Sequence, residues 1–234
     1  MTASPPPHKT VARQTVAQIM NPGAIAFVGA SEDLRKFGGR IFHNTVTGGF
    51  QGRIVPVNPK RESLLGLPCV PLVSAAPEPV DVAVIAVPRE LALDHVRDCA
   101  QAGVACCVLI TAGFTETGPE GAALEQEILA TARAHGMRLI GPNCLGFINT
   151  HARLIMNSSP AMQETAHIPG GIGFISQSGA LMATVYNRGV GDGARFSSAV
   201  SVGNQADLEL ADFMEWMARD ENTRCVTLYV EGFK

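Results

Sequence analysis

The chain has little charge, few aromatic residues and no long apolar run. Charged residues make up 17% of its 234 residues and the formal net charge is only −3. The sequence therefore has no clustered basic face of the kind that binds nucleic acid or an anionic membrane surface. No apolar run approaches the ~18 residues of a membrane span, and the N-terminal MTASPPPHKTVARQ has no apolar signal-peptide core. We expect a cytoplasmic protein that binds neither nucleic acid nor a membrane.

The six cysteines are not spaced as metal ligands or as a redox pair. They are scattered without a Cys-x-x-Cys motif, so the sequence suggests neither a zinc site nor a thioredoxin-like motif, and we predict no metal site. Cys106 and Cys107 fall in an apolar strand-like run, where buried reduced thiols are the expected state. What the chain does contain is 46% hydrophobic residues, a proportion typical of a compact core.

Short β-branched runs alternate with helical patterns from Ala24 onward. Two stretches, residues 89–103 and 119–136, carry apolar residues at helical spacing. The repeated β-α-β pattern predicts a doubly wound α/β domain over residues 21–146. It follows a flexible leader of residues 1–20, which is Pro-rich and then weakly amphipathic, a disordered lead into a short helix. Apolar runs without period-two alternation predict five parallel strands within residues 24–30, 53–59, 80–88, 104–113 and 137–143.

The alternation restarts after residue 170 and predicts a second α/β domain. We expect a loop from the end of the first domain to the glycine pair Gly170-Gly171. Its three strands extend to the last residues of the sequence, so we expect this second domain, residues 147–234, to be partial. Strands are expected at residues 171–176, 196–204 and 225–232, with helices at 181–189 and 208–220 between them.

Ligands of open α/β sheets bind beyond the carboxyl ends of the strands, so the candidate site lies there. The first strand is followed by VGASEDLRKFGGR, which is longer than the Gly-x-Gly-x-x-Gly motif, although Gly38-Gly39 is placed to open a helix toward a phosphate. After the second strand, Lys60 stands where a NAD-binding domain presents an acidic residue. A lysine there favours a phosphorylated ribose, that of NADP or of coenzyme A, and a solvated loop lysine is the alternative.

A second candidate site is the strand-to-helix turn Ser176-Gln177-Ser178-Gly179. Free backbone N–H groups, two hydroxyls and a helix dipole of ~+0.5 charge suit a phosphate dianion. A nucleophilic serine would require Gly-x-Ser-x-Gly, and neither serine has these neighbours. A plain helix N-cap at either serine is the alternative and is compatible with phosphate binding. Downstream, Asp207 is expected either to cap the next helix or to belong to the site.

Taken together, VGAS, VNPK, AVP, ITAGF and GPNCLG, in this order and each at a strand's carboxyl end, resemble the CoA-binding domain of the succinyl-CoA synthetase α subunit. The sequence is more similar to the NDP-forming acyl-CoA synthetases, also called ADP-forming acetyl-CoA synthetases, over nearly everything from Ala24 to Lys234. The resemblance implies a Rossmann-like CoA-binding domain followed by a partial flavodoxin-like, succinyl-CoA synthetase-like domain.

The resemblance also implies which residues contact CoA. Those implied at its nucleotide are Gly29, Ala30, Ser31, Lys36, Phe37 and Gly38. Those implied at its ribose and 3′-phosphate are Asn58, Pro59 and Lys60, and those at the adenine end are Val87 and Pro88. Those implied along the pantetheine arm are Thr111, Ala112, Gly113, Phe114, Asn143 and Cys144.

For the second domain, the resemblance implies chemistry through a phosphohistidine. Ser176, Gln177, Ser178 and Gly179 would bind its phosphoryl group, and Glu231 would be a catalytic residue that hydrogen-bonds the histidine. SVGN in the following strand is similar to the family's Ser-x-Gly-Asn turn. In the family the histidine lies further along the chain than the glutamate. None of the six present matches its context: His8, His43, His95, His135, His151 and His167.

The function implied is that of the CoA-binding portion of an NDP-forming acyl-CoA synthetase. Such an enzyme converts a carboxylic acid, CoA and ATP into acyl-CoA, ADP and phosphate. ATP, ADP and Mg would bind an ATP-grasp domain or subunit absent from this chain, and we expect an oligomer whose isolated chain is inactive. Two alternatives stay open: a CoA-binding regulatory module or synthetase-like part of a protein acetyltransferase, and an NADP-dependent dehydrogenase.

Overall fold

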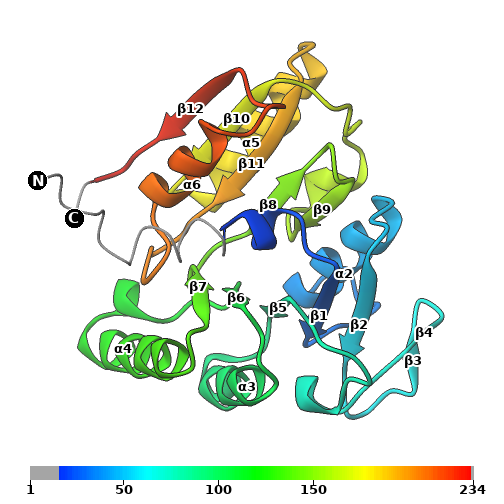
Figure 1. The fold of residues 1–234 in the computed structure, drawn as a ribbon, viewed down its shortest axis with the longest axis vertical. Helices are drawn as coiled ribbons and strands as arrows, with labels where there is room; N and C mark the ends of the chain where they lie inside the picture. Colours follow the sequence, from blue (N-terminus) through cyan, green and yellow to red (C-terminus); the bar gives the residue numbers. More distant parts are fainter. Residues whose placement is uncertain (1–15, 233–234) are drawn as a thin grey trace, which may run out of the picture.

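The computed structural model describes residues 16–232, which form two packed α/β units (Figure 1). All five strands predicted for the first unit are present: β1 (Ala24–Val28), β2 (Arg53–Val57), β5 (Val82–Ile85), β6 (Cys106–Leu109) and β7 (Arg138–Ile140). They pair in parallel in the order β2-β1-β5-β6-β7. The order reverses between β1 and β5, so the carboxyl ends of these two strands are the expected binding edge. A small antiparallel pair, β3 (Ser63–Leu64) and β4 (Leu67–Pro68), and a short 3-10 helix, η1 (Val73–Ala75), connect β2 to β5.

Both faces of the first sheet are covered, as the unbroken apolar runs predicted. Along β5, Ala83 and Ile85 pack against α3 (Arg89–Gln101) and α4 (Pro119–Ala134). Cys107 of β6 is buried in the same cluster. Val82 and Val84 face the opposite side, toward α2 (Phe37–Thr47) and the second unit. The two predicted helices are confirmed as α3 and α4. α4 begins at a proline, whose missing N–H costs nothing at a first helical position.

The second unit has five strands rather than three. β10 (Ile172–Ser176), β11 (Phe196–Ser201) and β12 (Cys225–Tyr229) correspond to the predicted strands and are parallel. The predicted loop instead contains an antiparallel hairpin, β8 (Gly146–Asn149) and β9 (Leu154–Asn157), and a 3-10 helix, η3 (Pro160–Gln163). The hairpin adds to β11 and gives the order β12-β10-β11-β8-β9. The prediction of a loop was wrong because two four-residue strands around a tight turn carry too little periodicity to be recognised.

The helices of the second unit are α5 (Gly179–Gly191) and α6 (Leu210–Met217). α6 is capped by a pair of reciprocal hydrogen bonds. The side chain of Glu209 accepts from the N–H of Asp212, and the side chain of Asp212 accepts from the N–H of Glu209. Asp207, for which a helix cap was one of two expected roles, does not cap α6. Its carboxylate accepts hydrogen bonds from Arg138 Nε (2.6 Å) and from the N–H of Leu139 (3.1 Å), both in β7.

The two units share a continuous interface. Ile41 and Phe42 of α2 belong to the same buried cluster as Phe147 of β8 and Ile175 of β10. The chain after β11 then runs along the chain after β7, and three backbone hydrogen bonds join residues 204–208 to residues 139–142, at 2.9, 2.9 and 3.1 Å. The carboxyl ends of strands from both sheets are therefore held against one another.

Residues 16–20, which we expected to belong to a flexible leader, are helical and packed. Val16, Ile19 and Met20 are buried in the cluster between the units. Asn149 also donates a hydrogen bond to the carbonyl of Met20 (2.8 Å). The short helix expected at the end of the leader is therefore present, but it is packed against the rest of the protein rather than flexible; residues 1–15 lie outside the described part. Within residues 16–232, no helix combines the length and apolar character needed to cross a bilayer.

Candidate functional site

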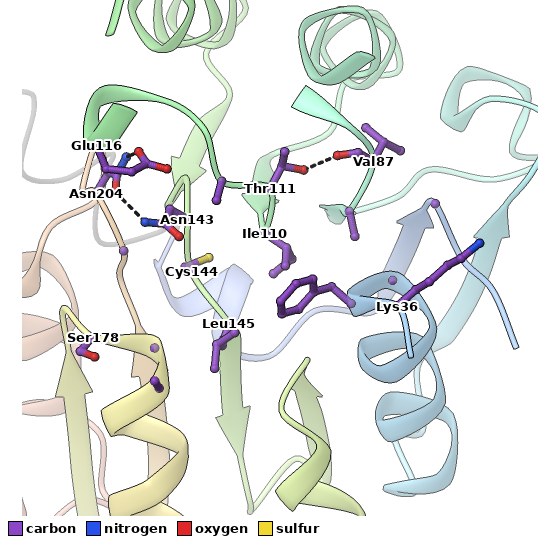
Figure 2. Close-up of a pocket in the computed structure, with 18 of the residues that line it drawn as sticks. Lys36, Val87, Ile110, Thr111, Glu116, Asn143, Cys144, Leu145, Ser178 and Asn204 are labelled. Carbon is purple, nitrogen blue, oxygen red and sulfur yellow. Dashed lines mark hydrogen bonds between the residues drawn. The ribbon is translucent and has the colours of Figure 1, made fainter. Parts of the chain in front are cut away.

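A cavity of about 740 Å³ lies where the carboxyl ends of the two sheets meet (Figure 2). Its walls come from the segments that follow β1, β5, β6 and β7 of the first unit and β10, β11 and β12 of the second. β1 and β5 are the neighbours at which the strand order reverses, where an open α/β sheet binds its ligand. The volume is in the range of small-molecule sites.

At one end of the cavity the turn after β1 packs directly on the start of α2. Gly29 has φ +85°, and a Cβ there would lie 2.5 Å from the carbonyl oxygen of Ala86. A Cβ on Gly38 would lie 2.3 Å from the carbonyl oxygen of Gly29. Only glycine permits these approaches. They bring the N-terminal turn of α2 to the cavity wall.

This end of the cavity is electropositive. No side chain caps the N-terminus of α2, and its first turn holds no acidic residue. The first N–H groups of a helix have no intrahelical partner and carry the positive end of its dipole. Lys36, at the N-cap position, has an exposed side chain that lines the cavity (Figure 2). The neighbouring Arg40 stacks on Phe37 and donates to three backbone carbonyls, so Arg40 is used structurally.

The middle of the cavity is mostly apolar and is formed by the loops after β5 and β6. Thr111 Oγ1 donates to the carbonyl oxygen of Val87 (2.7 Å), which ties these two loops together. Around this bond the wall is made by Ala86, Val87, Pro88, Ile110 and Ala112. Such a wall suits a flexible, largely apolar ligand segment.

The opposite end carries a hydrogen-bonded cluster that spans both units (Figure 2). Asn204 Nδ2 donates to Glu116 Oε2 (2.6 Å) and to Glu125 Oε2 (3.0 Å), and Asn143 Nδ2 lies 3.4 Å from Asn204 Oδ1. The N–H of Gly113 donates to Glu116 Oε1 (2.6 Å). Partial burial opposes ionisation of Glu116, but the hydrogen bonds from Asn204 and Gly113 outweigh it and lower the pKa of Glu116.

Cys144 lies beside this cluster but is not an ionised thiol. Its side chain is 2% exposed, and burial raises the pKa of Cys144 to about 12. Its Sγ lies 3.5 Å from the carbonyl oxygen of Leu109. Because the thiolate and not the thiol is the nucleophile, Cys144 shapes the wall rather than reacting.

The turn formed by Ser176, Gln177, Ser178 and Gly179 begins α5 at the end of the cavity far from Lys36 (Figure 2). Ser178 is the N-cap, and its Oγ accepts from the N–H of Leu181 (3.3 Å). Ser176 is fully buried and donates to the carbonyl oxygen of Ser178 (2.7 Å). Gln177 hydrogen-bonds the backbone of Glu231 and Gly232. The N-cap interpretation is therefore confirmed for Ser178, while the first N–H groups of α5 still open on the cavity.

The structure brings most of the predicted site residues together around this one cavity. These are Gly29, Lys36, Phe37, Gly38, Val87, Pro88, Thr111, Ala112, Asn143, Cys144, Gln177, Ser178, Gly179 and Glu231.

Other predicted residues do not line the cavity. Ala30 and Phe114 are buried in the hydrophobic core, and the side chain of Ser176 lies beneath the turn. Lys60 is exposed at the carboxyl end of β2, and Asn58 Nδ2 donates to the carbonyl oxygen of Ala30 (3.0 Å), so this turn adjoins the one after β1. The remaining residues outside the lining are Ser31, Pro59 and Gly113.

Several lining residues were not predicted: Ala86, Ile110, Glu116, Leu145, Ala180, Gly203 and Asn204. Ala86 and Ile110 end apolar runs that the sequence did identify, and Asn204 belongs to the SVGN turn. Nothing in the sequence marked Glu116 as a site residue, because its hydrogen-bond partner Asn204 lies 88 residues away in the sequence.

The described histidines lie away from the cavity. His167 bonds the hydroxyl of Tyr186 and the carbonyl oxygen of Met162 (both 3.0 Å), and burial lowers the pKa of His167. His135 and His151 contact backbone carbonyls. Among residues 16–232, none of the five histidines lines the cavity; His8 lies outside the described part.

Comparison with known proteins assigns both units. Residues 23–150 match the CoA binding domain family, and residues 169–234 match the succinyl-CoA ligase like flavodoxin domain family. The chain is 41% identical over 215 residues to subunit alpha of acetate–CoA ligase (ADP-forming) II of Pyrococcus furiosus, covering 92% of this chain and 46% of that protein. It is 32% identical over 217 residues to 4-hydroxybutyrate–CoA ligase (ADP-forming) of Nitrosopumilus maritimus, covering 93% of this chain and 31% of that protein.

A solved structure agrees with these matches. Dinucleotide forming acetyl-coenzyme A synthetase 1 of Ca. Korarchaeum cryptofilum, solved in complex with phosphate and ADP, superposes with a TM-score of 0.89 at 42% identity. The superposition covers 94% of this chain and 46% of that one. The chain thus spans less than half the length of each of these relatives.

Proposed function

The chain belongs to the CoA-binding domain family, and on this premise we propose that it is the CoA-binding part of an ADP-forming acyl-CoA synthetase. In this reaction a carboxylic acid, CoA and ATP give an acyl-CoA, ADP and phosphate. The steps that use ATP and Mg belong to an ATP-grasp domain or partner subunit. The similarity to subunits alpha of ADP-forming acetate–CoA ligases supports this division.

The observation that carries the proposal is a single cavity with a helix N-terminus at each end. The N-terminus of α2 and Lys36 lie at one end, and the N-terminus of α5 lies at the other. CoA has its phosphates on a nucleotide at one end and its thiol at the other. The phosphates fit the Lys36 end, because helix N-termini and lysine side chains bind phosphate. The pantetheine arm then follows the apolar wall between Val87 and Ile110.

The glycines at the α2 end support this orientation. A Cβ at Gly29 or Gly38 would collide with backbone, so the turn after β1 packs closely on the start of α2 and places both glycines in the cavity wall. Lys60, in the turn after the neighbouring strand β2, is assigned to the 3′-phosphate of CoA. An exposed lysine at the end of β2 is long enough to meet a ligand that begins at the turn after β1.

At the end of the cavity far from Lys36, the N-terminus of α5 is assigned to bind the phosphoryl group that the reaction transfers. Its first N–H groups and the hydroxyl of Ser178 stabilise phosphate oxygens. Glu231 lines the same end, where it would hold the N–H of a phosphoryl-carrying histidine. The Cys144 thiol stays protonated near neutral pH and does not compete with the thiol of CoA for an activated acyl group.

Calorimetric titration of the chain with CoA, and separately with NADP, tests the proposal. We expect saturable binding of CoA with one site per chain and no binding of NADP. Thr184→Glu, on the exposed face of α5 outside the cavity lining, is the control that leaves binding unchanged. Binding of NADP without binding of CoA would overturn the proposal and would favour a dehydrogenase.

A further inference from the structure

We propose that Glu116 is a specificity-determining residue that selects against acyl groups carrying a second negative charge. The acyl groups accepted at this end of the cavity are those whose tails are uncharged. The inference rests on the proposed function, because it concerns the acyl end of the same CoA cavity.

The charges that line the cavity are segregated. Lys36 is the one basic residue in its lining, whereas Glu116 and Glu231 are the acidic ones, counted among the residues the structure describes. Figure 2 places Lys36 on one side and Glu116, with Asn204 and Asn143, on the other. The basic side chain of the lining therefore lies at the nucleotide end, and both acidic side chains lie at the end that receives the thiol and the acyl group, which also holds the N-terminus of α5.

The carboxylate of Glu116 is fixed in place but its charge is not cancelled. One oxygen accepts from the N–H of Gly113 and the other from Asn204 Nδ2, each at 2.6 Å. Both donors are neutral amides, which orient an ionised carboxylate and leave its negative charge facing the cavity. The lowered pKa of Glu116 agrees with an ionised group near neutral pH.

In the part of the chain that the structure describes, no cationic side chain forms an ion pair with Glu116, although Arg89 Nη1 donates to the carbonyl oxygen of Gly113 (3.1 Å). Among the ion pairs of residues 16–232, none includes Glu116, Glu125 or Glu231. Glu125, 5% exposed, shares the amide of Asn204 with Glu116 and adds a second carboxylate behind it. The nearby Arg89 pairs instead with Glu90 and Glu120.

The geometry directs the acyl tail toward Glu116. The thiol end of CoA reaches Asn143 and Cys144, and the N-terminus of α5 takes the phosphoryl group on the side of Ser178. The acyl carbonyl lies between them, so its tail continues along the remaining wall, formed by Asn204 and Glu116 (Figure 2). A carboxylate on that tail would approach Glu116 without a cationic partner, and juxtaposed like charges are a recognised way to reject a ligand.

Calorimetry with three thioesters of CoA tests this assignment on the chain itself. The probes are acetyl-CoA, succinyl-CoA and succinamoyl-CoA, in which a neutral amide replaces the free carboxylate of the succinyl group. At low ionic strength we expect succinyl-CoA to bind about fivefold more weakly than succinamoyl-CoA, the size of effect typical of incompletely buried charge pairs. In Glu116→Gln the two probes should bind alike. Glu221→Gln, an exposed carboxylate outside the cavity lining, should retain the fivefold gap.

A second measurement needs no variant. Raising the ionic strength to about 0.5 M shortens the Debye length to a few ångströms, so the gap between the two probes in the unaltered chain should shrink. Equal binding of succinyl-CoA and succinamoyl-CoA at low salt overturns the role of Glu116, as does a gap that survives in Glu116→Gln while acetyl-CoA binding is retained. Failure of CoA and acetyl-CoA to bind at all overturns the proposed function and this inference with it.

Discussion

The side chain of Gln177 holds the backbone of Glu231. Gln177 Oε1 accepts from the N–H groups of Glu231 and Gly232, and Gln177 Nε2 donates to the carbonyl oxygen of Gly232 (2.8 Å). These bonds join the turn after β10 to the end of β12, 54 and 55 residues later in the sequence. The amide of Gln177, which the sequence assigned to phosphate binding, is thus occupied in placing the segment that carries Glu231.

Gln177→Ala should release this segment. Loss of three hydrogen bonds at an exposed site should lower the local free energy of opening by about 1–2 kcal/mol. Hydrogen exchange of the Glu231 and Gly232 amides should therefore become about 5 to 30 times faster, while CoA affinity changes little. Gln51→Ala, which removes a bond to the carbonyl of Gly49, is the matched control and should leave those amides unchanged. Unaltered exchange at Glu231 in Gln177→Ala would contradict the clamp.

Replacing Lys36 and replacing Lys60 should affect the binding of CoA and dephospho-CoA differently. Lys36→Ala should weaken CoA and dephospho-CoA alike, by about 1.5–3 kcal/mol, because Lys36 is assigned to phosphates that both ligands carry. Lys60→Ala should weaken CoA by a similar amount and dephospho-CoA much less, because Lys60 is assigned to the 3′-phosphate. Calorimetry with the two ligands measures both effects. Equal loss for both ligands in Lys60→Ala would remove Lys60 from the 3′-phosphate.

Gly38→Ala should destabilise the fold, because its Cβ would lie 2.3 Å from the carbonyl oxygen of Gly29. Overpacking against backbone costs typically about 1–3 kcal/mol of the free energy of unfolding, measured by urea denaturation. Gly191→Ala is the control in another helix. Apart from its chain neighbours and the backbone of its own helix, no atom lies within 4 Å of its Cβ position, so this change should be neutral or stabilising by up to about 1 kcal/mol. Equal effects of the two changes would argue against the close packing of α2 on the β1 turn.

Asp207→Asn should also lower the free energy of unfolding. The Asp207 side chain is 6% exposed and pairs with Arg138 at 2.6 Å, so its neutralisation leaves a largely buried guanidinium without its counter-ion. Breaking such a pair costs about 3–5 kcal/mol. Asp192→Asn, whose side chain is 78% exposed and 4.0 Å from Arg188, should change stability by less than about 0.5 kcal/mol. A small effect of Asp207→Asn in urea unfolding would mean that this link between the units contributes little.

The sequence predicted the first sheet because it depends on local pattern, whereas most of the cavity residues were predicted from the resemblance to a known family. Five unbroken apolar runs gave β1, β2, β5, β6 and β7, and parallel strands necessarily gather their carboxyl ends at one edge. What it missed depends on contacts between distant residues. The Glu116–Asn204 bond joins two units, and Asp207 binds Arg138 rather than capping α6. The β8–β9 hairpin was missed because its strands are short and gain stability only by adding to β11.

The most direct measurement is a crystal structure of the chain with CoA bound. The account predicts the CoA phosphates within hydrogen-bond distance of Lys36 and the N-terminus of α2, and the thiol at the end of the cavity lined by Cys144, Asn143 and Ser178. CoA bound outside this cavity, or with its nucleotide at the Glu116 end, would contradict it.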